Sequence, residues 1–493
     1  MKQEALRFDR VTSPSHVPAE LRHFSLRIFS GEIMGILPLN AIGLRSLLNL
    51  LRQNTPIHYG FVYYREHLVN DWRNPSHSYN RIGIIQSQSG LADDLTVADN
   101  VFVLRPGFRK RYLSRRILAD QLTPFLREIN VDISANATAR DLSPFERFVV
   151  ELVKAVVAGA KLIAIHDAAT VISDANLHKL HDILRHYAAK GISFLYISNH
   201  YEELRQVAHR AALMMNGQII KILDPKTVTP ETINAFGAKQ FINLIRTQNA
   251  SRPQLPPSPP AIEFHHLAFH AISDLSLRIA PGECVVLQDL DNAIIDNLIA
   301  LLSFLEKPAS GSFSLPSNSP SPIARRVAII QKLATNSMLF PELSYFDNLC
   351  FTMDHLLPRF WLRSKPKLSV RREVLPWLGA GVFEKSIDEL SLFEKYDLIY
   401  ARILLQRPQV VFCVQPFMQA DVELRMHIWT LIERLLRKGI AVCILAVNLS
   451  DSLSLADRLV CIQGGRVASA YDRAHFGTLP ENIPWQFLWH PKK

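Results

Sequence analysis

Glycine is scarce in this sequence, with 19 residues among 493. That is about 4%, whereas an average protein contains about 7%. Loops that hold phosphate groups with their backbone N–H groups depend on glycine. The chain therefore has few places where such a loop can form.

Cysteine is also scarce, and no two of the five cysteines form a C-x-x-C pair. This excludes a disulfide or zinc framework and predicts buried thiols in a reducing compartment. No uncharged apolar run reaches the roughly 18 residues that a membrane span needs. The start, MKQEALRFDR, lacks the apolar core of a signal peptide, so we expect neither a membrane span nor secretion. The cysteines are Cys284, Cys350, Cys413, Cys443 and Cys461.

The charges exclude little, because 55 basic and 45 acidic residues leave a net charge of only +10. A mild basic excess fits an anionic partner, such as an inner membrane surface or nucleic acid, and fits a plain solvated surface equally well. The length predicts two or more domains. The hydrophobic content of 48% is enough to form large cores.

The sequence repeats itself once. Three pairs of segments match in order at offsets of about 250 residues, which indicates a duplicated domain. The linker between the copies, residues 248–260, is rich in proline and cannot form a core. We expect one domain over residues 1–247 and a second over 261–493. The pairs are FSLRIFSGE (24–32) with LSLRIAPGE (275–283), LSPFERF (142–148) with LSLFEKY (390–396), and AHRAALMMNGQI (208–219) with ADRLVCIQGGRV (456–467).

Within each copy, short apolar runs alternate with segments of helical period. In the first half, residues 143–159 place Phe148, Val149, Leu152 and Val156 on one side of a predicted helix. Strand, helix and strand in this order predict a mostly parallel sheet covered by helices. The strand-like runs are GEIMGIL (31–37), RIGIIQ (81–86), KLIAIH (161–166), ISFLYIS (192–198) and AALMM (211–215).

The stretch GEIMGILPLNAIGLRSLLNLL, residues 31–51, has the layout of a phosphate-binding loop between a strand and a helix. The usual pattern is G-x-x-x-x-G-K-[ST]. Here Pro38 replaces the first glycine, Gly43 keeps the second, and Leu44 and Arg45 replace the lysine and the hydroxyl residue. Such a loop would lie at the carboxyl end of the first strand of the sheet.

These segments together resemble the ATP-binding subunit of ABC transporters, in the tandem form of ribose- and xylose-type carbohydrate importers. The segments that carry the resemblance are LSLRIAPGE with its counterpart in the first half, RIGIIQSQSGLADDLTVADNVFV, LSPFERFVVELVKAVVAGAKLIAIHDAAT, GISFLYISNHYEEL and MMNGQII. The resemblance implies an α/β fold of two tandem P-loop NTPase-like ABC nucleotide-binding domains. Each would hold a mostly parallel sheet with helices and a helical subdomain.

The resemblance also implies partners and a location. The expected partners are an ABC permease membrane subunit and a solute-binding protein, and the two halves are expected to pack face to face. The chain would lie in the cytoplasm, peripheral on the inner face of the cell membrane. Two basic clusters with aromatic residues, 105–116 and 359–372, have a composition that suits nucleic acid. In this family they belong to the membrane-docking helical subdomain, so we expect no nucleic acid partner.

In the first half, the places that the family uses for ATP hydrolysis carry other residues. Leu44 stands for the lysine and Arg45 for the magnesium-binding hydroxyl, while Ser46 keeps a hydroxyl nearby. His166 stands for the magnesium aspartate and Asp167 for the catalytic glutamate. Ser87 lies at the place of the sensing glutamine, between Gln86 and Gln88, and Asn199 at that of the switch histidine, beside His200.

The second half departs further. Its loop, VVLQDLDNAIIDNLI, has no glycine and contains Asp289, Asp291 and Asp296, whose charges would repel phosphate. Gln415 and Val447 stand for the catalytic glutamate and the switch histidine. We expect no metal site built from these residues.

The signature segment L-S-G-G-Q is altered in both halves. Ser143 and Ser391 are each followed at the third place by a glutamate, Glu146 and Glu394. This spacing predicts a capping box at a helix N-terminus. A changed interface between the halves is the alternative. The candidate nucleotide contacts, by position only, are Asn40, Gly43, Arg45, Ser46, Gln86, Ser143 and Ser391.

Asp167 is the one catalytic-type carboxylate that remains, so we expect ATP to bind weakly and leave Mg²⁺ open. The hypothesis is an ABC-type ATPase by fold that is inactive or very slow, with a regulatory or structural role at a sugar transporter. The first alternative is an active ATP hydrolase that powers carbohydrate import. The second is a soluble scaffold detached from transport.

Overall fold

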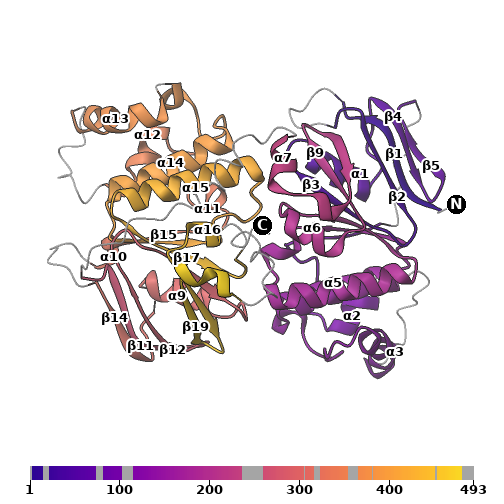
Figure 1. Ribbon diagram of the computed structural model, residues 1–493, viewed down its shortest axis with the longest axis horizontal. Helices are drawn as coiled ribbons and strands as arrows, with labels where there is room; N and C mark the ends of the chain where they lie inside the picture. The colour runs from indigo at the N-terminus through magenta and orange to yellow at the C-terminus, as the bar shows by residue number, and fades with distance from the viewer. Residues whose placement is uncertain are drawn as a thin grey trace. The chain divides into compact units, whose positions relative to one another are not determined.

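The computed structural model describes residues 3–14, 21–73, 82–102, 115–235, 259–304, 306–315, 323–353, 365–379, 381–449 and 452–479 (Figure 1). The chain divides into two units, one mainly of residues 1–243 and the other mainly of residues 244–480. These units correspond to the first and second halves of the repeat. The boundaries that we predicted, at 247 and 260, border a linker that is almost wholly outside the described residues, and they stay a prediction.

Within its described residues, the first half contains ten strands in two sheets. They are β1 (Glu4–Thr12), β2 (Phe24–Phe29), β3 (Ile33–Pro38), β4 (Tyr59–Tyr64), β5 (His67–Asp71), β6 (Ile82–Ile85), β7 (Leu162–His166), β8 (Ser193–Ile197), β9 (Arg210–Met215) and β10 (Gln218–Leu223). An antiparallel sheet has the order β2-β1-β4-β5, and a second sheet has the order β10-β9-β3-β8-β7-β6. All pairs of the second sheet are parallel except β9 with β10.

The helices of the first half are α1 (Leu44–Arg52), α2 (Val97–Phe102), α3 (Arg115–Glu128), α4 (Pro144–Val157), α5 (Asp174–Ala189), α6 (Tyr201–Val207) and α7 (Pro230–Ala235). Apolar residues of α1, among them Leu47 and Leu50, join Met34 of β3 and Phe8 of β1 in one buried core. This core fixes the start of α1 against the end of β3. In α4, Phe148, Val149 and Leu152 are buried as predicted, whereas Val156 is half-buried and Val153 is buried in its place.

The second half repeats the parallel part of this plan, but its described antiparallel strands join the parallel ones in a single nine-stranded sheet. Its strands are β11 (Ile262–Phe269), β12 (Ile272–Ile279), β13 (Cys284–Asp289), β14 (Ser310–Ser314), β15 (Val327–Ile330), β16 (Val410–Val414), β17 (Ala441–Ala446), β18 (Arg458–Gln463) and β19 (Arg466–Asp472). The order β19-β18-β13-β17-β16-β15 reproduces β10-β9-β3-β8-β7-β6 strand for strand. The two halves therefore place equivalent loops at equivalent points.

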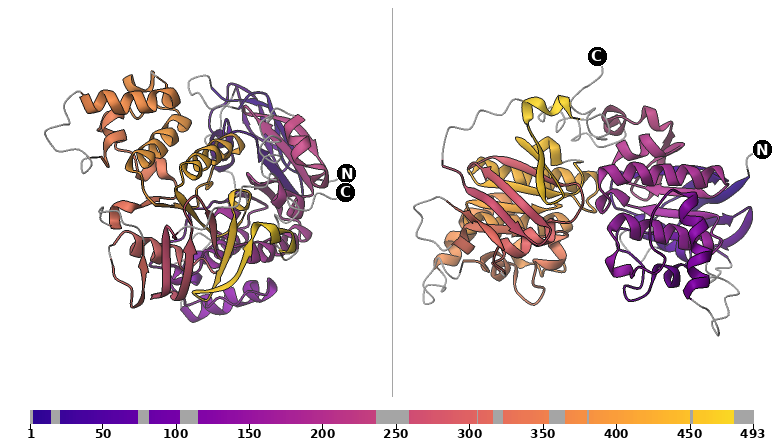
Figure 2. Two further views of the ribbon diagram at one scale, coloured as in Figure 1. Left: turned by 60° about the vertical axis from the view of Figure 1, so that its left-hand side comes forward. Right: turned by 90° about the horizontal axis from the view of Figure 1, so that it is seen from below.

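The helices of the second half are α9 (Ile295–Leu302), α10 (Ile323–Arg326), α11 (Ala334–Ser337), α12 (Tyr345–Cys350), α13 (Lys365–Leu378), α14 (Leu392–Gln406), α15 (Val422–Arg437) and α16 (Ser452–Leu455). In Figures 1 and 2, α12, α13 and α14 gather at the end of this half that is opposite β11, β12 and β14. They form the helical subdomain that the resemblance implied. The predicted fold class is confirmed.

The cysteines behave as the sequence predicted. Four of them are buried on β13, β16, β17 and β18, Cys350 is half-buried, and within the described residues none of the five is in a disulfide. Within the described residues, no helix is long and apolar enough to cross a bilayer.

Candidate nucleotide site

The loop of the first half runs from Pro38, the last residue of β3, to Gly43, which precedes α1. Gly43 has a left-handed backbone with φ of 84°. A Cβ atom there would lie 2.7 Å from the Cα atom of Gly217, so no other residue fits without a shift. The glycine that the sequence analysis matched to the phosphate-loop pattern thus has a backbone role of its own.

Asn40 ties this loop to the turn between β9 and β10. Its Nδ2 donates to Oδ1 of Asn216 over 2.9 Å, and the backbone N–H of Asn216 donates to Oδ1 of Asn40 over 3.0 Å. Asn40 is buried, so this paired contact uses its amide on both sides. The structure thus gives Asn40 a positioning task, and its predicted contact with nucleotide stays a prediction.

The first turn of α1 carries Arg45 and Ser46. Arg45 is exposed and Ser46 is half-buried. No acidic residue lies in this turn, so the positive end of the helix dipole is not neutralised from within its own first turn.

Asp167 is buried at the carboxyl end of β7, with 3% of its surface exposed. Its carboxylate accepts hydrogen bonds from Nδ2 of Asn199, with distances of 3.1 and 3.4 Å to the two oxygens. Nε2 of His166 lies 3.3 Å from Oδ2 of the same carboxylate. The residues at the magnesium, catalytic and switch positions therefore contact one another.

Sheet order explains why these residues meet. β3 lies beside β8, and β8 lies beside β7, all parallel, so the loops after them share one edge of the sheet. Gln86 directly follows β6, the next strand along, and is half-buried. The structure thus brings the loop, Asp167, Asn199 and Gln86 to the same edge.

In the second half, the side chain of Asp289 occupies the loop. Asp289 ends β13 at the place of Pro38, and its Oδ2 accepts the backbone N–H of Ile294 over 2.7 Å. The backbone N–H groups of Ala293 and Ile295 also bond to this carboxylate. Burial raises the pKa of Asp289, while these three N–H groups oppose that rise. A carboxylate of the chain itself thus takes the donors that would face a phosphate.

Asp291 repeats the tie made by Asn40. Its Oδ2 accepts the backbone N–H of Gly464, in the turn between β18 and β19, over 2.7 Å. We expected Asp289, Asp291 and Asp296 to act as one repulsive group, but two of the three bond to backbone N–H groups instead. Asp296 lies in the first turn of α9, where a carboxylate favours the helix dipole.

The backbone at the catalytic position is alike in both halves although the side chains differ. Asp167 and Gln415 have φ of 53° and 42°. Each donates its N–H to the adjacent strand, to the carbonyl of Ile197 over 3.0 Å or of Leu445 over 2.9 Å. Val447, at the switch position of the second half, is buried and apolar.

Ser143 and Ser391 begin α4 and α14 as helix caps. In each helix the serine side chain accepts the N–H of the third residue, Glu146 or Glu394, whose carboxylate accepts the serine N–H over 2.8 Å. The predicted capping boxes are confirmed. A contact of either serine with nucleotide stays a prediction.

Two functional features escaped the sequence analysis. Gln331 follows β15 as Gln86 follows β6, and the repeated motif IIQ (84–86 and 329–331) is the signal that would have found it. The second is the bond from Asp289 to its own loop. No local sequence motif indicates this bond, because the loop lies between Asp289 and Ile294.

The chain matches full-length proteins at low identity. It is 21% identical over 481 residues to Ribose import ATP-binding protein RbsA 2 of Mesorhizobium japonicum, covering 94% of this chain and 93% of that protein. It is 23% identical over 465 residues to Ribose import ATP-binding protein RbsA 3 of Rubrobacter xylanophilus, covering 92% of each. No family model matches.

Solved structures with two such domains share the fold. Archaeal ribosome recycling factor aABCE1, in complex with the stalk protein aP1, superimposes with a TM-score of 0.60 at 13% identity, covering 94% of this chain and 90% of that chain. The structure named RNase-L Inhibitor gives 0.58 at 13% identity, with the same coverage. The chain has the fold of two tandem ATP-binding-cassette (ABC) domains.

The two halves differ in how well their residues fit the nucleotide and magnesium that the resemblance implied. The second half does not fit a phosphate, because the carboxylate of Asp289 already holds the loop N–H groups. The first half has Pro38 at that place, which offers no side-chain oxygen. Its hydroxyl of Ser46 and its loop backbone are the groups that would hold a phosphate.

Magnesium fits poorly in either half. The ion prefers oxygen ligands, and Arg45 and His166 stand where a hydroxyl and a carboxylate would bind it. The carboxylate of Asp167 already bonds to Asn199. Within the described residues, no group of three His, Cys, Asp or Glu side chains is arranged to hold a metal ion.

Proposed function

We propose that this ABC protein is the ATP-binding-cassette subunit of a sugar-type transporter and acts as a pseudo-ATPase, with a regulatory or structural role. The similarity to ribose import ATP-binding proteins extends over both halves, which supports the transport context. The observation that carries the loss of catalysis is the carboxylate of Asp289, bonded to the N–H groups of its own loop.

Energetic magnitudes support this proposal. A hydrogen bond to a charged group is worth about 1.5 to 3 kcal/mol. Each half lacks the phosphate-binding lysine and one or both magnesium ligands, so the losses sum to on the order of 5 kcal/mol, or more than a thousandfold in rate. Asp167 alone does not replace them, because a general base still needs a held γ-phosphate.

ATP, where it binds, binds weakly and in the first half. Gly43, Ser46 and the loop backbone would hold its phosphates, and Gln86 lies at the same sheet edge. The positive end of α1 favours an anion there. Magnesium contributes little, because the residues at its ligand positions are Arg45 and His166.

The partners follow from the transport context. The chain would dock through its helical subdomains on an ABC permease membrane subunit that works with a solute-binding protein. It would lie at the cytoplasmic face of the cell membrane, with its halves face to face. The mild basic excess suits that anionic surface.

The test is equilibrium binding of ATP to the purified full-length chain, with and without Mg²⁺, beside a phosphate-release assay. We expect binding no tighter than millimolar, insensitive to Mg²⁺, and no release. Micromolar binding that needs Mg²⁺, with turnover that falls when Asp167→Asn is introduced, would establish the active hydrolase instead.

The partner is tested separately, by co-purification of the full-length chain with an ABC permease membrane subunit. We expect a stable complex whether or not ATP is present. A chain that never associates with a permease, and hydrolyses nothing, would be the detached scaffold.

A further inference from the structure

The second half contains a cavity of about 850 Å³ that lies away from the nucleotide loop. It is lined by Ala261, Gln409 and Ile440, which directly precede β11, β16 and β17. The cavity therefore lies at the amino-terminal edge of the parallel strands, whereas Asp289 lies at their carboxyl-terminal edge. Its volume is within the range of sites that hold small molecules.

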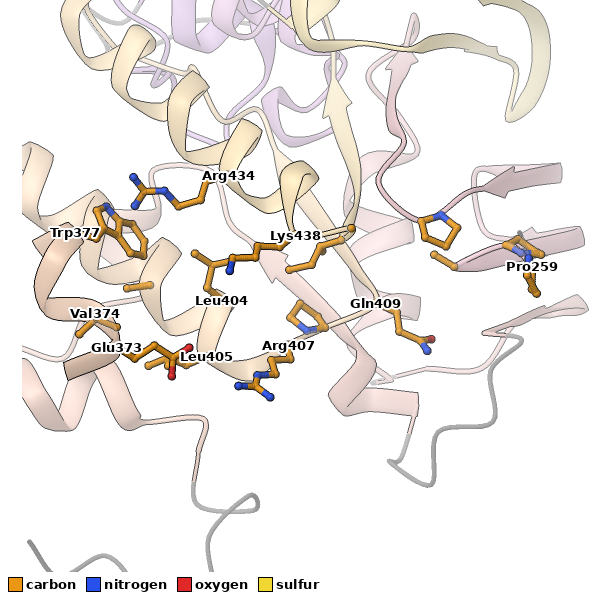
Figure 3. Close-up of a pocket in the computed structure, with 17 residues that line it drawn as sticks. Pro259, Glu373, Val374, Trp377, Leu404, Leu405, Arg407, Gln409, Arg434 and Lys438 are labelled. Atoms are coloured by element: carbon orange, nitrogen blue, oxygen red, sulfur yellow. The ribbon is translucent and has the colours of Figure 1, made fainter. Parts of the chain in front are cut away.

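The wall of the cavity is apolar, and positive charges border it. Val374 and Trp377 of α13 face Leu404 and Leu405 of α14 (Figure 3). The cations are Arg407, Arg434 and Lys438. In Figure 3, Glu373, the acid in the lining, lies beside Leu405, away from Arg434.

Arg434 has one guanidinium nitrogen without an acceptor among the described residues. Its guanidinium stacks on the ring of Trp377, 4.0 Å from the centroid. Its Nη1 atom is buried and has no hydrogen-bond partner. A buried donor without an acceptor costs free energy, and within the described part of the chain none of the three cations forms an ion pair.

The matching place in the first half shows what such an acceptor would be. His186 and Lys190 are the counterparts of Arg434 and Lys438 at the repeat offset of 248 residues. Both contact Oε1 of Glu128, the last residue of α3, at 2.7 and 2.6 Å. In the second half, α13 ends at Leu378 and Gly379, which have no carboxylate.

We propose that this cavity binds a small ligand with one carboxylate and an apolar body. Arg434 and Lys438 would take the carboxylate, as His186 and Lys190 take that of Glu128. Trp377, Val374 and Leu404 would cover the apolar body. Burial of the apolar body of the ligand would give affinity. The charge-assisted bond to its carboxylate would make binding depend on the acid group.

The experiment is calorimetric titration of the full-length chain with two probe acids, 4-phenylbutyrate and octanoate, and with the uncharged 4-phenylbutanamide. We expect one binding site for each acid and at least tenfold weaker binding of the amide. Arg434→Gln and Lys438→Gln should each weaken the acids about tenfold or more and leave the amide unchanged, because a charge-assisted bond is lost.

Two further variants keep the test decisive. Arg437→Gln removes a charge from the same helix, but Arg437 pairs with Glu433 at 3.1 Å and lies outside the cavity, so binding should not change. Leu404→Trp fills the cavity without changing any charge and should abolish binding, with circular dichroism checking that each variant folds. Equal affinity for acid and amide, binding that survives Leu404→Trp, or no saturation at millimolar acid would overturn the proposal.

Discussion

The two phosphate-type loops of this chain have equivalent positions between strand and helix, but they differ in whether the loop itself contains a carboxylate. In the first half, the loop from Pro38 to Gly43 contains no acidic residue of its own, whereas in the second half the side chain of Asp289 bonds to the N–H groups of its own loop. Asn40 and Asp291 fix both loops to equivalent turns. The loss of nucleotide chemistry that we propose would thus take two forms, removal of ligands in one half and replacement of the phosphate by a carboxylate in the other.

A second difference between the halves concerns a buried carboxylate on α6, that of Glu203. The first half buries Glu203, whose Oε2 accepts the hydroxyl of Tyr196 over 2.8 Å, with Nε2 of His181 3.3 Å from the same hydroxyl. At the places of Tyr196 and His181, the second half has Ile444 and Trp429. Burial raises the pKa of Glu203 to about 8 and lowers that of His181 to about 3. Tyr196 and His181 therefore have no ionisable counterparts at these places of the second half.

The largest expected effect is on the pH dependence of the first half. Glu203 holds its proton when folded, so between its usual pKa of 4.5 and about 8 the folded state binds more protons than the unfolded state. The free energy of unfolding therefore falls as pH rises through this window, by on the order of 4 kcal/mol. Glu203→Gln keeps an acceptor for Tyr196 and should remove this fall.

Urea unfolding of both proteins at pH 5, 6.5 and 8.5 measures it. Asp182→Asn, at an exposed pair with Arg185 in the same half, is the control and should leave the pH profile unchanged. Parallel profiles for the parent and Glu203→Gln would show that Glu203 is ionised in the folded state.

The next effect concerns the loop of the second half. Asp289→Ala leaves three backbone N–H groups without their acceptor and should lower the free energy of unfolding by about 3 kcal/mol. Asp289→Asn keeps one oxygen and should cost about 1 kcal/mol. Hydrogen exchange at the amides of Ile294 and Ile295 should speed up in the same order. If alanine and asparagine behave alike, the carboxylate does not hold the loop.

Removing the capping box should destabilise the two halves equally. Ser143→Ala and Ser391→Ala remove matching caps, so each should cost about 1 kcal/mol, measured by urea unfolding. Threonine at either position is the control, because it keeps the capping hydroxyl and should retain most of the stability. Unequal losses would mean that one serine has a contact beyond its helix.

The smallest effect is at Glu128. Its hydrogen bond from Lys190 lowers the pKa of Glu128, so this pair stabilises above pH 4.5 and the contribution fades as pH falls. Because these groups are partly exposed, Glu128→Gln should cost only about 0.5 kcal/mol at pH 7 and nothing at pH 3, measured from thermal midpoints. A loss that persists at pH 3 would come from packing and not from charge.

Much of the fold followed from the sequence, because its signals are local. The runs at 31–37, 161–166 and 192–198 are continuous and apolar, as strands buried on both faces require, and they became β3, β7 and β8. The capping boxes depend on residues three apart. The repeat offset then carried the whole strand order from one half to the other.

The site was less predictable, because its bonds join distant segments. Asn199 is 32 residues from Asp167, and Gly464 is 173 residues from Asp291. Composition indicated three repelling carboxylates in the second loop, but only the folded chain determines which N–H groups each one meets. The bond between Asn40 and Asn216, which are 176 residues apart, likewise has no local signal in the sequence.

The anion in the second loop, the carboxylate of Asp289, is part of the chain, so its local concentration is constant. A protein that gains stability from a bound nucleotide becomes more or less stable as the concentration of that nucleotide changes. Asp289 instead keeps the loop before α9 satisfied at every nucleotide concentration. The second half should therefore stay equally folded in a starved cell and a well-fed one.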